Sequence, residues 1–241
     1  MINKDEFTRA REKEHKVEVI IPTLNEEGNI DSVIEHTFLY ADEVLVIDGN
    51  STDGTIDVAK KTGARILLQK GKGKGAALKE AFKHCNSEII IIIDGDGSMI
   101  PNEIPIFLEG LYSGADIVKG SRFIEKGGSD DITLLRRFGN SIFVFLSNYI
   151  FGSKFTDICY GYMAFKKSSI EKLIPILHSN GFEIETEIII KAKKLGLKII
   201  EVPSFELKRS YGKSKLKIFR DGLKILMIII EEAFKKILIK K

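Results

Sequence analysis

Two aspartates separated by a single glycine, Asp94 and Asp96, follow a run of five isoleucines in this 241-residue chain. A short run of β-branched apolar residues is typical of a strand buried on both faces of an α/β sheet. Such sheets bind ligands just beyond the carboxyl ends of their central strands, where both carboxylates would lie. Two hard oxygen ligands there would suit a Mg²⁺ or Mn²⁺ ion carrying a diphosphate. Taken alone, Asp-Gly-Asp-Gly is equally compatible with a plain polar turn.

Other polar side chains follow two further predicted strands. Asn25 and Glu26 come after a strand at residues 17–21, and Asp48 comes after a strand at residues 44–47. Because the carboxyl ends of parallel strands share one edge of a sheet, we expect these residues and the two aspartates to converge on one crevice.

A segment rich in glycine and lysine, GKGKGAAL at residues 71–78, comes after a third predicted strand. Its Lys74 and the amides that begin the following helix could hold a phosphate group. The segment is not a Walker P-loop, because GxxxxGK[ST] is absent. A flexible surface loop is the alternative interpretation.

Charged residues also occur at two predicted helix starts. Arg136 and Arg137 begin a helix at residues 134–150, where positive charge is disfavoured unless an anion binds; a solvated pair is the alternative. A second helix begins with the glutamates of EIETE at residues 183–187. These glutamates, and Asp157 in a loop before a strand, are candidate general bases for a hydroxyl acceptor. Acidic residues also stabilise a first helical turn without any catalytic role.

The elements that would position these residues alternate between strand and helix. Strands are predicted at residues 17–21, 44–47, 64–68, 89–93, 116–122 and 199–202, and helices at about 30–40, 56–62, 76–85, 104–113, 134–150, 182–195 and 216–239. This alternation predicts an α/β fold with a doubly wound, Rossmann-like and mostly parallel central sheet flanked by helices. No GxGxxG follows the first strand, so the usual dinucleotide fingerprint is missing.

The composition fits one α/β domain with an appendage. Hydrophobic residues make up 44% of the chain, which is enough for an ordinary core, and the two cysteines have no metal-binding spacing. No apolar run is long enough for a transmembrane helix, and the first residues are too charged for a signal peptide. We therefore expect a cytoplasmic protein with a polar N-terminal arm (1–16), a main domain (17–215) and an amphipathic basic helix (216–241).

The C-terminal segment differs in charge from the rest of the chain. Residues 208–241 contain eleven Lys and Arg against three Asp and Glu, a net charge of +8, while the remainder has a net charge of −5. Its longest unbroken apolar run, residues 225–230, is far too short to span a membrane. Basic residues around an apolar stripe predict a helix that lies on the cytoplasmic face of a membrane. Packing on the domain or on a second subunit is the alternative.

Six short motifs occur in a specific order between residues 17 and 220. They are PTLNEEGNI (22–30), VIDGNSTDGT (46–55), GKGKGAAL (71–78), DGDGSMIPNEIP (94–105), GSRF (120–123) and RSYGKSK (209–215). Each motif is weak alone, but together they resemble the inverting family 2 glycosyltransferases of GT-A fold. Within that family the chain is most similar to the dolichol-phosphate or polyprenyl-phosphate mannose and glucose synthases.

This resemblance implies a set of site residues. The donor would be bound by Pro22, Asn25, Glu26, Asp48, Lys74, Asp94, Gly95, Asp96, Arg209 and Lys215. The metal ion, Mg²⁺ or Mn²⁺, would be held by Asp94 and Asp96, with Asp96 the more direct ligand. The acceptor phosphate would be bound by Arg122, Arg137 and Ser141. Catalysis would rest on Asp94, Asp96, Arg209 and Lys215, and on Asp157 if a base is needed.

The implied reaction moves a hexose from GDP-mannose or a UDP-sugar to a dolichyl or polyprenyl phosphate, with inversion at the anomeric carbon. A lipid phosphate is largely ionised near neutral pH, so a strong general base is less necessary. The expected partners are the nucleotide-diphosphate sugar, the lipid phosphate and a membrane surface or membrane subunit, without nucleic acid. A transferase acting on a soluble or glycan hydroxyl and a non-catalytic nucleotide-sugar-binding protein are the alternatives.

Two departures from the family pattern bear on this interpretation. Gly49 replaces the usual second aspartate of the nucleotide motif, so recognition of the base or ribose is expected to differ. Gly97 and Ser98 stand where mannose synthases often have a glutamine after the two aspartates, which leaves the third metal ligand open.

Overall fold

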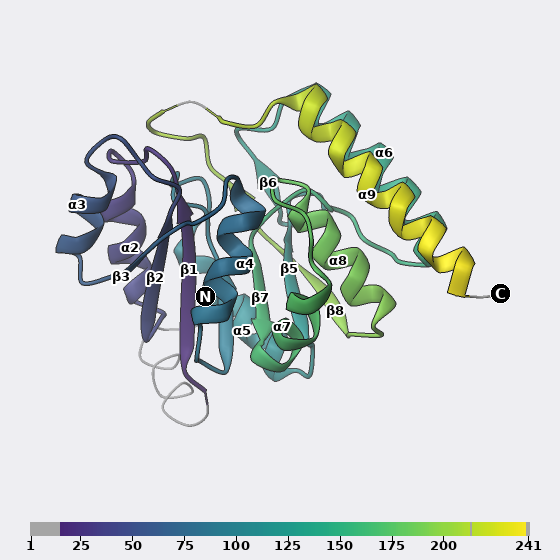
Figure 1. The fold of residues 1–241 in the computed structure, drawn as a ribbon, viewed down its shortest axis with the longest axis horizontal. Helices are drawn as coiled ribbons and strands as arrows, with labels where there is room; N and C mark the ends of the chain where they lie inside the picture. Colours follow the sequence, from purple (N-terminus) through teal and green to yellow (C-terminus); the bar gives the residue numbers. More distant parts are fainter. Residues whose placement is uncertain (1–14, 213, 240–241) are drawn as a thin grey trace.

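The computed structural model describes residues 15–212 and 214–239, so most of the predicted N-terminal arm lies outside the described residues. A seven-stranded sheet with the order β3-β2-β1-β4-β7-β5-β8 forms its centre (Figure 1). The strands are β1 (Val17–Thr23), β2 (Glu43–Asp48), β3 (Arg65–Leu68), β4 (Ile89–Ile92), β5 (Ile117–Ser121), β7 (Met163–Lys166) and β8 (Ile199–Pro203). All are parallel except β7, which is antiparallel to β4 and β5. The predicted fold class is confirmed.

Helices cover both faces of this sheet. The helices are α2 (Ile30–Phe38), α3 (Thr55–Lys61), α4 (Lys74–His84), α5 (Ile104–Tyr112), α6 (Leu134–Phe151), α7 (Lys167–Leu173), α8 (Ile184–Lys194) and α9 (Ile218–Ile239). Side chains of β4 alternate between two apolar cores, one shared with α2, α3 and α5 and the other with α4 and α8. The isoleucine run is buried for this reason, because alternate strand residues point to opposite faces and both faces are covered.

Three features of the fold were not expected from the sequence. Helix α7 follows β7 directly, and the short strands β6 (Gly128–Ser129) and β9 (Phe205–Glu206) pair in a separate two-stranded sheet. Strand β7 enters the sheet antiparallel between β4 and β5, so the residues just before it reach the same edge as the carboxyl ends of the parallel strands. This antiparallel insertion brings Tyr160 and Gly161 to the ligand-binding edge.

Helices α6 and α9 lie side by side at one end of the molecule (Figure 1). Ile225, Ile228 and Ile229 on the inner side of α9 are buried, and Lys236 Nζ donates to the Ile150 carbonyl at 2.6 Å. The C-terminal helix is therefore docked on the domain along one stripe. None of the helices in residues 15–212 and 214–239 is long and apolar enough to cross a membrane.

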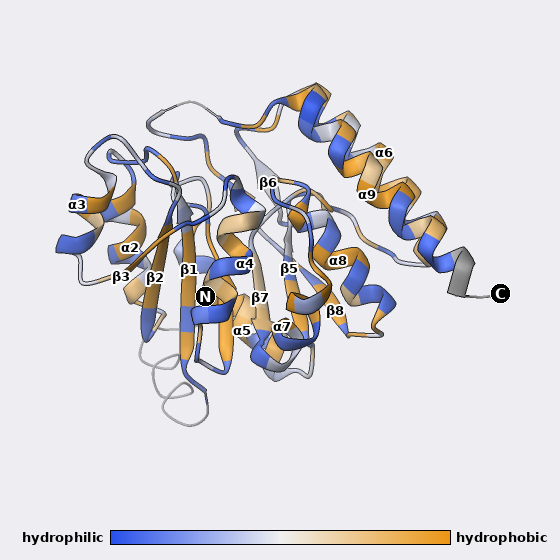
Figure 2. Ribbon diagram, viewed as in Figure 1, coloured by the Kyte–Doolittle hydropathy of each residue, from blue (hydrophilic) through white to orange (hydrophobic). Residues whose placement is uncertain are grey.

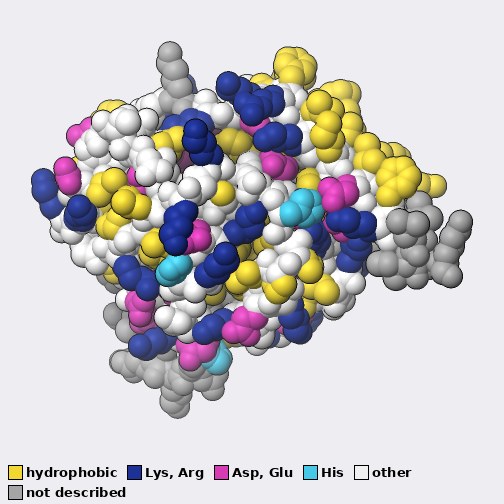
Figure 3. Space-filling view, in the orientation of Figure 1, with side chains coloured by type: hydrophobic (Ala, Val, Ile, Leu, Met, Phe, Trp, Pro, Cys, Tyr) yellow, Lys and Arg dark blue, Asp and Glu magenta, His cyan; other side chains and the backbone are white. Residues whose placement is uncertain are grey.

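The outer stripes of both helices are apolar and exposed. Hydrophobic side chains gather over α6 and α9 in Figure 3, and hydrophobic segments alternate with hydrophilic ones along both helices in Figure 2. The exposed large residues there are Leu134, Leu135, Phe138, Ile142, Phe145, Tyr149, Phe219, Leu223, Met227, Ile230 and Phe234. We call these eleven residues the α6–α9 face.

Candidate functional site

A cleft of about 530 Å³ opens at the carboxyl ends of β1, β2 and β4. It is the crevice expected at this edge of a parallel sheet. Nine of the predicted site residues line it: Pro22, Glu26, Lys74, Asp94, Gly95, Asp96, Arg122, Arg209 and Lys215. The segments that contribute them lie far apart in the sequence, so the fold alone brings these groups together.

The two aspartates of the DGD motif are each bound to a cation. Asp94 Oδ1 lies 2.5 Å from Lys74 Nζ, and Asp96 Oδ2 pairs with Arg209. Burial raises the pKa of Asp94 to about 6, against the opposing effect of the Lys74 cation. Ser98 donates to Asp96 Oδ1 through its amide at 2.9 Å and its hydroxyl at 2.7 Å. Ser98 thus fixes the orientation of Asp96.

The donor set at this point fits a divalent cation that also binds a substrate. In the described part of the chain, no group of three or more His, Cys, Asp or Glu side chains is arranged to hold a metal ion. Asp94 and Asp96 therefore offer two carboxylates only. Mg²⁺ commonly binds through one or two carboxylates together with substrate phosphates and water, so the residues present fit such an ion. Gly95 is required between them, because a Cβ there would lie 2.6 Å from Thr23 Cγ2.

One glutamate of the EIETE segment reaches the cleft. Glu185 lines the cleft and its Oε1 lies 2.6 Å from Lys74 Nζ. Burial alone would lower the pKa of Lys74, but Asp94 and Glu185 outweigh it and raise the pKa. Glu187 instead pairs with Lys191 and His178, and Glu183 accepts from the Gly181 amide at 3.0 Å. The acidic first turn thus combines one cleft residue with two structural ones.

Asp48 and Asn25 hold two loops together beside the cleft. The fully buried Asp48 carboxylate accepts hydrogen bonds from the Thr23 hydroxyl at 3.1 Å and from the Ser51 amide and hydroxyl at 2.7 and 2.6 Å. Asn25 accepts from the Thr52 amide at 2.8 Å. Both side chains are thus engaged in ordering the loop after β2.

The loop with the RSYGKSK motif lies across the cleft. Arg209 contacts Asp96 and lies 3.4 Å from Glu26 Oε1, and Lys215 Nζ lies 2.7 Å from the same oxygen. Tyr211 packs on Gly28, where a Cβ would lie 3.0 Å from the ring. Lys213 lies outside the described residues. The motif cations therefore face Glu26 and Asp96, and Asp96 is one of the two proposed metal ligands.

A second group of charged residues also lines the cleft. Arg122 Nε donates to Asp157 at 2.7 Å and Arg122 Nη1 donates to Glu206 at 3.1 Å. Arg136 lies 3.0 Å from Asp131 and 3.7 Å from Glu206, and it also lines the cleft. We call Arg122 and Arg136 the arginine wall.

Asp157 is fully buried beneath this wall. Burial alone would raise its pKa, but the Arg122 and Lys119 cations hold it below its usual range. A buried carboxylate whose two oxygens both accept from Arg122 suits a positioning role. It does not offer the accessible oxygen that a general base needs.

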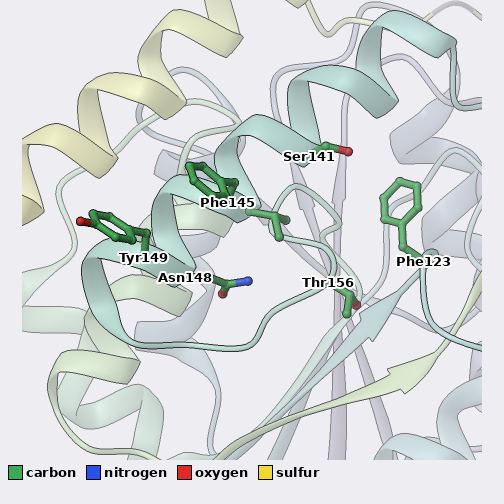
Figure 4. A pocket seen from close by; sticks show the side chains of 7 residues that line it. Phe123, Ser141, Phe145, Asn148, Tyr149 and Thr156 are labelled. Carbon is green, nitrogen blue, oxygen red and sulfur yellow. The ribbon is translucent and has the colours of Figure 1, made fainter.

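Arg137 and Ser141 are not among the residues that line this cleft, although the Arg122 guanidinium lies 5.6 Å from the centre of the Phe123 ring, which Arg137 also approaches. The Arg137 guanidinium lies 5.4 Å from the centre of the Phe123 ring, and the Ser141 hydroxyl donates to the Arg137 carbonyl at 3.0 Å. Ser141 lines another, shallower pocket on the flank of α6, together with Phe145 and Tyr149 (Figure 4). Arg136, rather than Arg137, reaches the cleft that holds Asp96.

Several cleft residues were missed by the sequence interpretation. Glu206, Gln69 and Ser98 line the cleft without belonging to a predicted site. Arg136 also lines it; the sequence offered Arg136 with Arg137 as an anion-binding pair, but the family resemblance implied only Arg137. Gln69 was detectable as the first polar residue after a predicted strand. Glu206 has no such signal, because its contact with Arg122 joins segments 84 positions apart.

Comparison with known proteins assigns the chain to a family. The family model described as glycosyl transferase family 2 matches residues 18–174. The chain is 39% identical over 211 residues to the glycosyltransferase AglJ of Haloferax volcanii, covering 85% of this chain and 67% of that protein. It is 30% identical over 216 residues to a dolichyl-phosphate hexose transferase of the same organism, covering 88% of this chain and 92% of that protein.

Solved structures show the same fold. Glucosyl-3-phosphoglycerate synthase from Mycobacterium tuberculosis, in complex with Mn²⁺, UDP and glucosyl-3-phosphoglycerate, superposes with a TM-score of 0.75 at 22% identity. The match covers 96% of this chain and 84% of that one. The chain belongs to glycosyltransferase family 2, has the GT-A fold and resembles the polyprenyl-phosphate sugar transferases of that family.

Proposed function

We propose that the protein transfers a hexose from a nucleotide-diphosphate sugar to a polyprenyl or dolichyl phosphate, with inversion and with the help of Mg²⁺ or Mn²⁺. One observation carries the choice of acceptor. The polar cleft continues into an apolar groove of about 350 Å³ between the first halves of α6 and α9. The two cavities share Arg122, Arg136, Cys159 and Leu216. An anionic head beside the arginines and an apolar chain in the groove match a lipid phosphate.

The donor part of the proposal rests on the edge of the sheet that carries Asp94 and Asp96. A nucleoside diphosphate bound there would meet Arg209 and Lys215 from the RSYGKSK loop, which already pair with Asp96 and Glu26. A metal ion held by Asp94 and Asp96 would supply further neutralisation of the diphosphate. The dissociating diphosphate develops negative charge, so cations fixed in advance at that position lower the barrier.

The acceptor half rests on the arginine wall. Asp157 fixes the Arg122 guanidinium, and Arg136 carries two carboxylate contacts of 3.0 and 3.7 Å that a phosphate would take over in part. Arg–phosphate contacts can be bidentate, which orients the anion as well as binding it. An ionised phosphate oxygen attacks without losing a proton, so the reaction needs no general base on this wall.

The proposal also places the protein at the cytoplasmic face of a membrane. Single exposed hydrophobic residues are common on protein surfaces, but the α6–α9 face gathers eleven of them on two adjacent helices. Continuous apolar patches of this kind are typical of interaction surfaces. Arg137, Arg220 and Lys224 lie on the same two helices, Lys217 immediately precedes α9, and these cations suit anionic headgroups. The apolar groove opens between these helices, so a lipid acceptor would enter from that surface.

A donor-by-acceptor assay tests the proposed function. Purified protein is incubated with Mn²⁺ and GDP-mannose, UDP-glucose or UDP-N-acetylglucosamine, and with polyprenyl phosphate or the matching polyprenol. We expect transfer from one donor to the phosphate and none to the alcohol. Transfer to polyprenol, or to a soluble sugar in preference to either lipid, would contradict the proposed acceptor.

A further inference from the structure

Glu206 is a carboxylate held by both residues of the arginine wall. Its Oε2 lies 3.1 Å from Arg122 Nη1 and its Oε1 lies 3.7 Å from Arg136 Nη2, so each oxygen faces one guanidinium. The Ser129 hydroxyl also donates to Oε2. The Glu206 side chain is 8% exposed and lines the cleft. A carboxylate of the protein therefore already bridges the two groups proposed to bind the acceptor phosphate.

Arg122 is fully engaged while this contact is in place. Its Nε and Nη2 donate to Asp157 at 2.7 and 3.1 Å, and its Nη1 donates to Glu206 at 3.1 Å. The centre of the Tyr160 ring lies 4.7 Å from the guanidinium carbon, and the Arg122 side chain is 3% exposed. Because the contacts with Asp157 are buried beneath the wall, Nη1 is the nitrogen that a phosphate would take over. To do so, the phosphate must displace Glu206.

The charges around the arginine wall also disfavour an added anion. In the described part of the chain, the carboxylates that pair with the two arginines are Asp131, Asp157 and Glu206. Lys119 is buried and adds a positive charge that acts on Asp157. Three negative and three positive groups leave this cluster neutral before any substrate binds. A phosphate monoester brings a charge of about −1.5 to −2 at pH 7, so it binds more readily once a carboxylate has moved away.

We propose that Glu206 is the residue that sets the affinity and selectivity of the acceptor site, as an internal counterion that the acceptor phosphate displaces from Arg122 and Arg136. This inference rests on the proposed function, because it requires a phosphate acceptor. An anion reaches the arginines by outcompeting a carboxylate fixed beside them. A neutral alcohol cannot replace the charge of that carboxylate and leaves Glu206 in place.

The exchange requires movement of one side chain. The Asp130 amide donates to the Glu206 carbonyl at 2.8 Å, and the Leu207 amide donates to the Ser98 carbonyl at 2.8 Å. The backbone of β9 is thus held at Glu206 and at the residue that follows it. Rotation about the side-chain bonds of the glutamate is enough to withdraw the carboxylate while the strand stays in place.

The displacement reverses after transfer. The glycosyl phosphodiester product retains a single negative charge, whereas the phosphate monoester carries about −1.5 to −2 near neutral pH. The product therefore competes less well with Glu206 for the arginines than the substrate does. Return of the carboxylate to Arg122 and Arg136 favours release of the product.

The test compares Glu206→Gln and Glu206→Asp with wild type and with Asp130→Asn. The last variant removes the same charge at an exposed position whose amide bonds the Glu206 carbonyl. Farnesyl phosphate, a short analogue of a polyprenyl phosphate, and farnesol, its neutral counterpart, are titrated by calorimetry. Steady-state kinetics with farnesyl phosphate and the preferred donor then give KM and kcat separately.

We expect Glu206→Gln to bind farnesyl phosphate about tenfold or more tightly than wild type, because a charged competitor has been removed from the arginines. Its KM for farnesyl phosphate should fall by a similar factor without an increase in kcat. Glu206→Asp draws the charge back by one methylene and should tighten binding by a smaller factor. Asp130→Asn should bind farnesyl phosphate as wild type does.

Unchanged or weaker binding of farnesyl phosphate in both Glu206 variants would overturn the inference, because a carboxylate that merely positions the arginines would give that result. A fall in kcat of about 10²–10⁴ with an unchanged KM would also overturn it and would identify Glu206 as a general base.

The farnesol titration separates this inference from the proposed function. If wild type and Glu206→Gln both bind farnesyl phosphate no better than farnesol, the proposed phosphate acceptor is wrong and the inference fails with it. If wild type prefers farnesyl phosphate and Glu206→Gln gains no affinity, the role of Glu206 alone is refuted.

Discussion

Replacement of Asp157 by Asn tests whether this residue positions Arg122 or acts as a base. The Asp157 carboxylate is fully buried, accepts from Arg122 Nε at 2.7 Å and from Nη2 at 3.1 Å, and shares that arginine with Glu206. An amide in its place leaves a buried guanidinium with one charged partner instead of two. We therefore expect a loss of stability together with a weaker acceptor site.

The size of the effect follows from the burial of the pair. Removing one partner of a buried ion pair costs about 3–5 kcal/mol. Because Glu206 remains and the amide retains one acceptor oxygen, we expect the lower end, about 3 kcal/mol. For a protein of this size each kcal/mol shifts Tm by about 2–4 °C, so Tm should fall by about 6–12 °C. Thermal unfolding followed by circular dichroism measures this, with Asp130→Asn, at an exposed position, as the control.

The pH dependence supplies a second readout. The pKa of Asp157 is lowered in the folded state, so its contribution is present above the unfolded pKa of about 3.9 and is lost as pH falls through the folded value. The difference in Tm between wild type and Asp157→Asn should therefore be full at pH 7 and shrink below about pH 4. A variant with wild-type Tm whose kcat falls by about 10²–10⁴ would refute the positioning role and identify a general base.

Three further predictions concern the metal, the arginines and the membrane. Asp96→Asn should abolish Mn²⁺-dependent turnover with little change in Tm, and wild-type rates in chelator would remove the metal from the mechanism. Arg136→Ala should raise the KM for polyprenyl phosphate by about tenfold or more, as loss of a charged hydrogen bond implies, with little change for the donor. Arg137→Ala should change the KM for polyprenyl phosphate less than about threefold. A larger increase in that KM for Arg137→Ala than for Arg136→Ala would instead place Arg137 in the acceptor site. Phe145→Ser with Phe219→Ser, at positions 67% and 83% exposed, should reduce flotation with anionic liposomes by about tenfold or more, since burying a Phe side chain contributes about 1.5–3 kcal/mol. Equal flotation of wild type and the double variant would contradict membrane binding by the α6–α9 face.

The sheet and its ligand-binding edge were predictable because local chemistry and tertiary structure agree there. The isoleucine run at 89–93 has one stable environment, a strand covered on both faces, and it must end at a polar edge. Parallel strands then bring Glu26 and Asp96 together without further information. The DGD motif was informative for the same reason.

The arginine wall could not be derived in this way. Arg136 and Arg137 are adjacent, and about 100° of helical rotation decides which one faces the cleft. That rotation depends on where the helix begins, which Thr133 fixes by accepting from the Arg136 amide at 3.3 Å. It also depends on Glu206, which β9 brings to Arg136 from a distant segment.

The C-terminal helix shows why both interpretations of an amphipathic segment can hold at once. The sequence pattern offered membrane binding and packing on the domain as alternatives. Ile225 and Ile229 pack on the domain, while Phe219, Leu223 and Met227 remain exposed beside the apolar residues of α6. The residue pattern of this helix alone could not predict that α6 lies beside it or that a groove opens between the two helices, because both features depend on tertiary packing.

The central claim is that an ionised lipid phosphate is the nucleophile, and phosphorus NMR of the product tests it most directly. Polyprenyl phosphate is incubated with the preferred donor and Mn²⁺, and the lipid fraction is examined for phosphate monoester and diester signals. The account predicts conversion of the lipid monoester to a glycosyl phosphodiester of inverted anomeric configuration, with release of the nucleoside diphosphate. A lipid monoester that stays unchanged while the sugar appears on a hydroxyl group would contradict it.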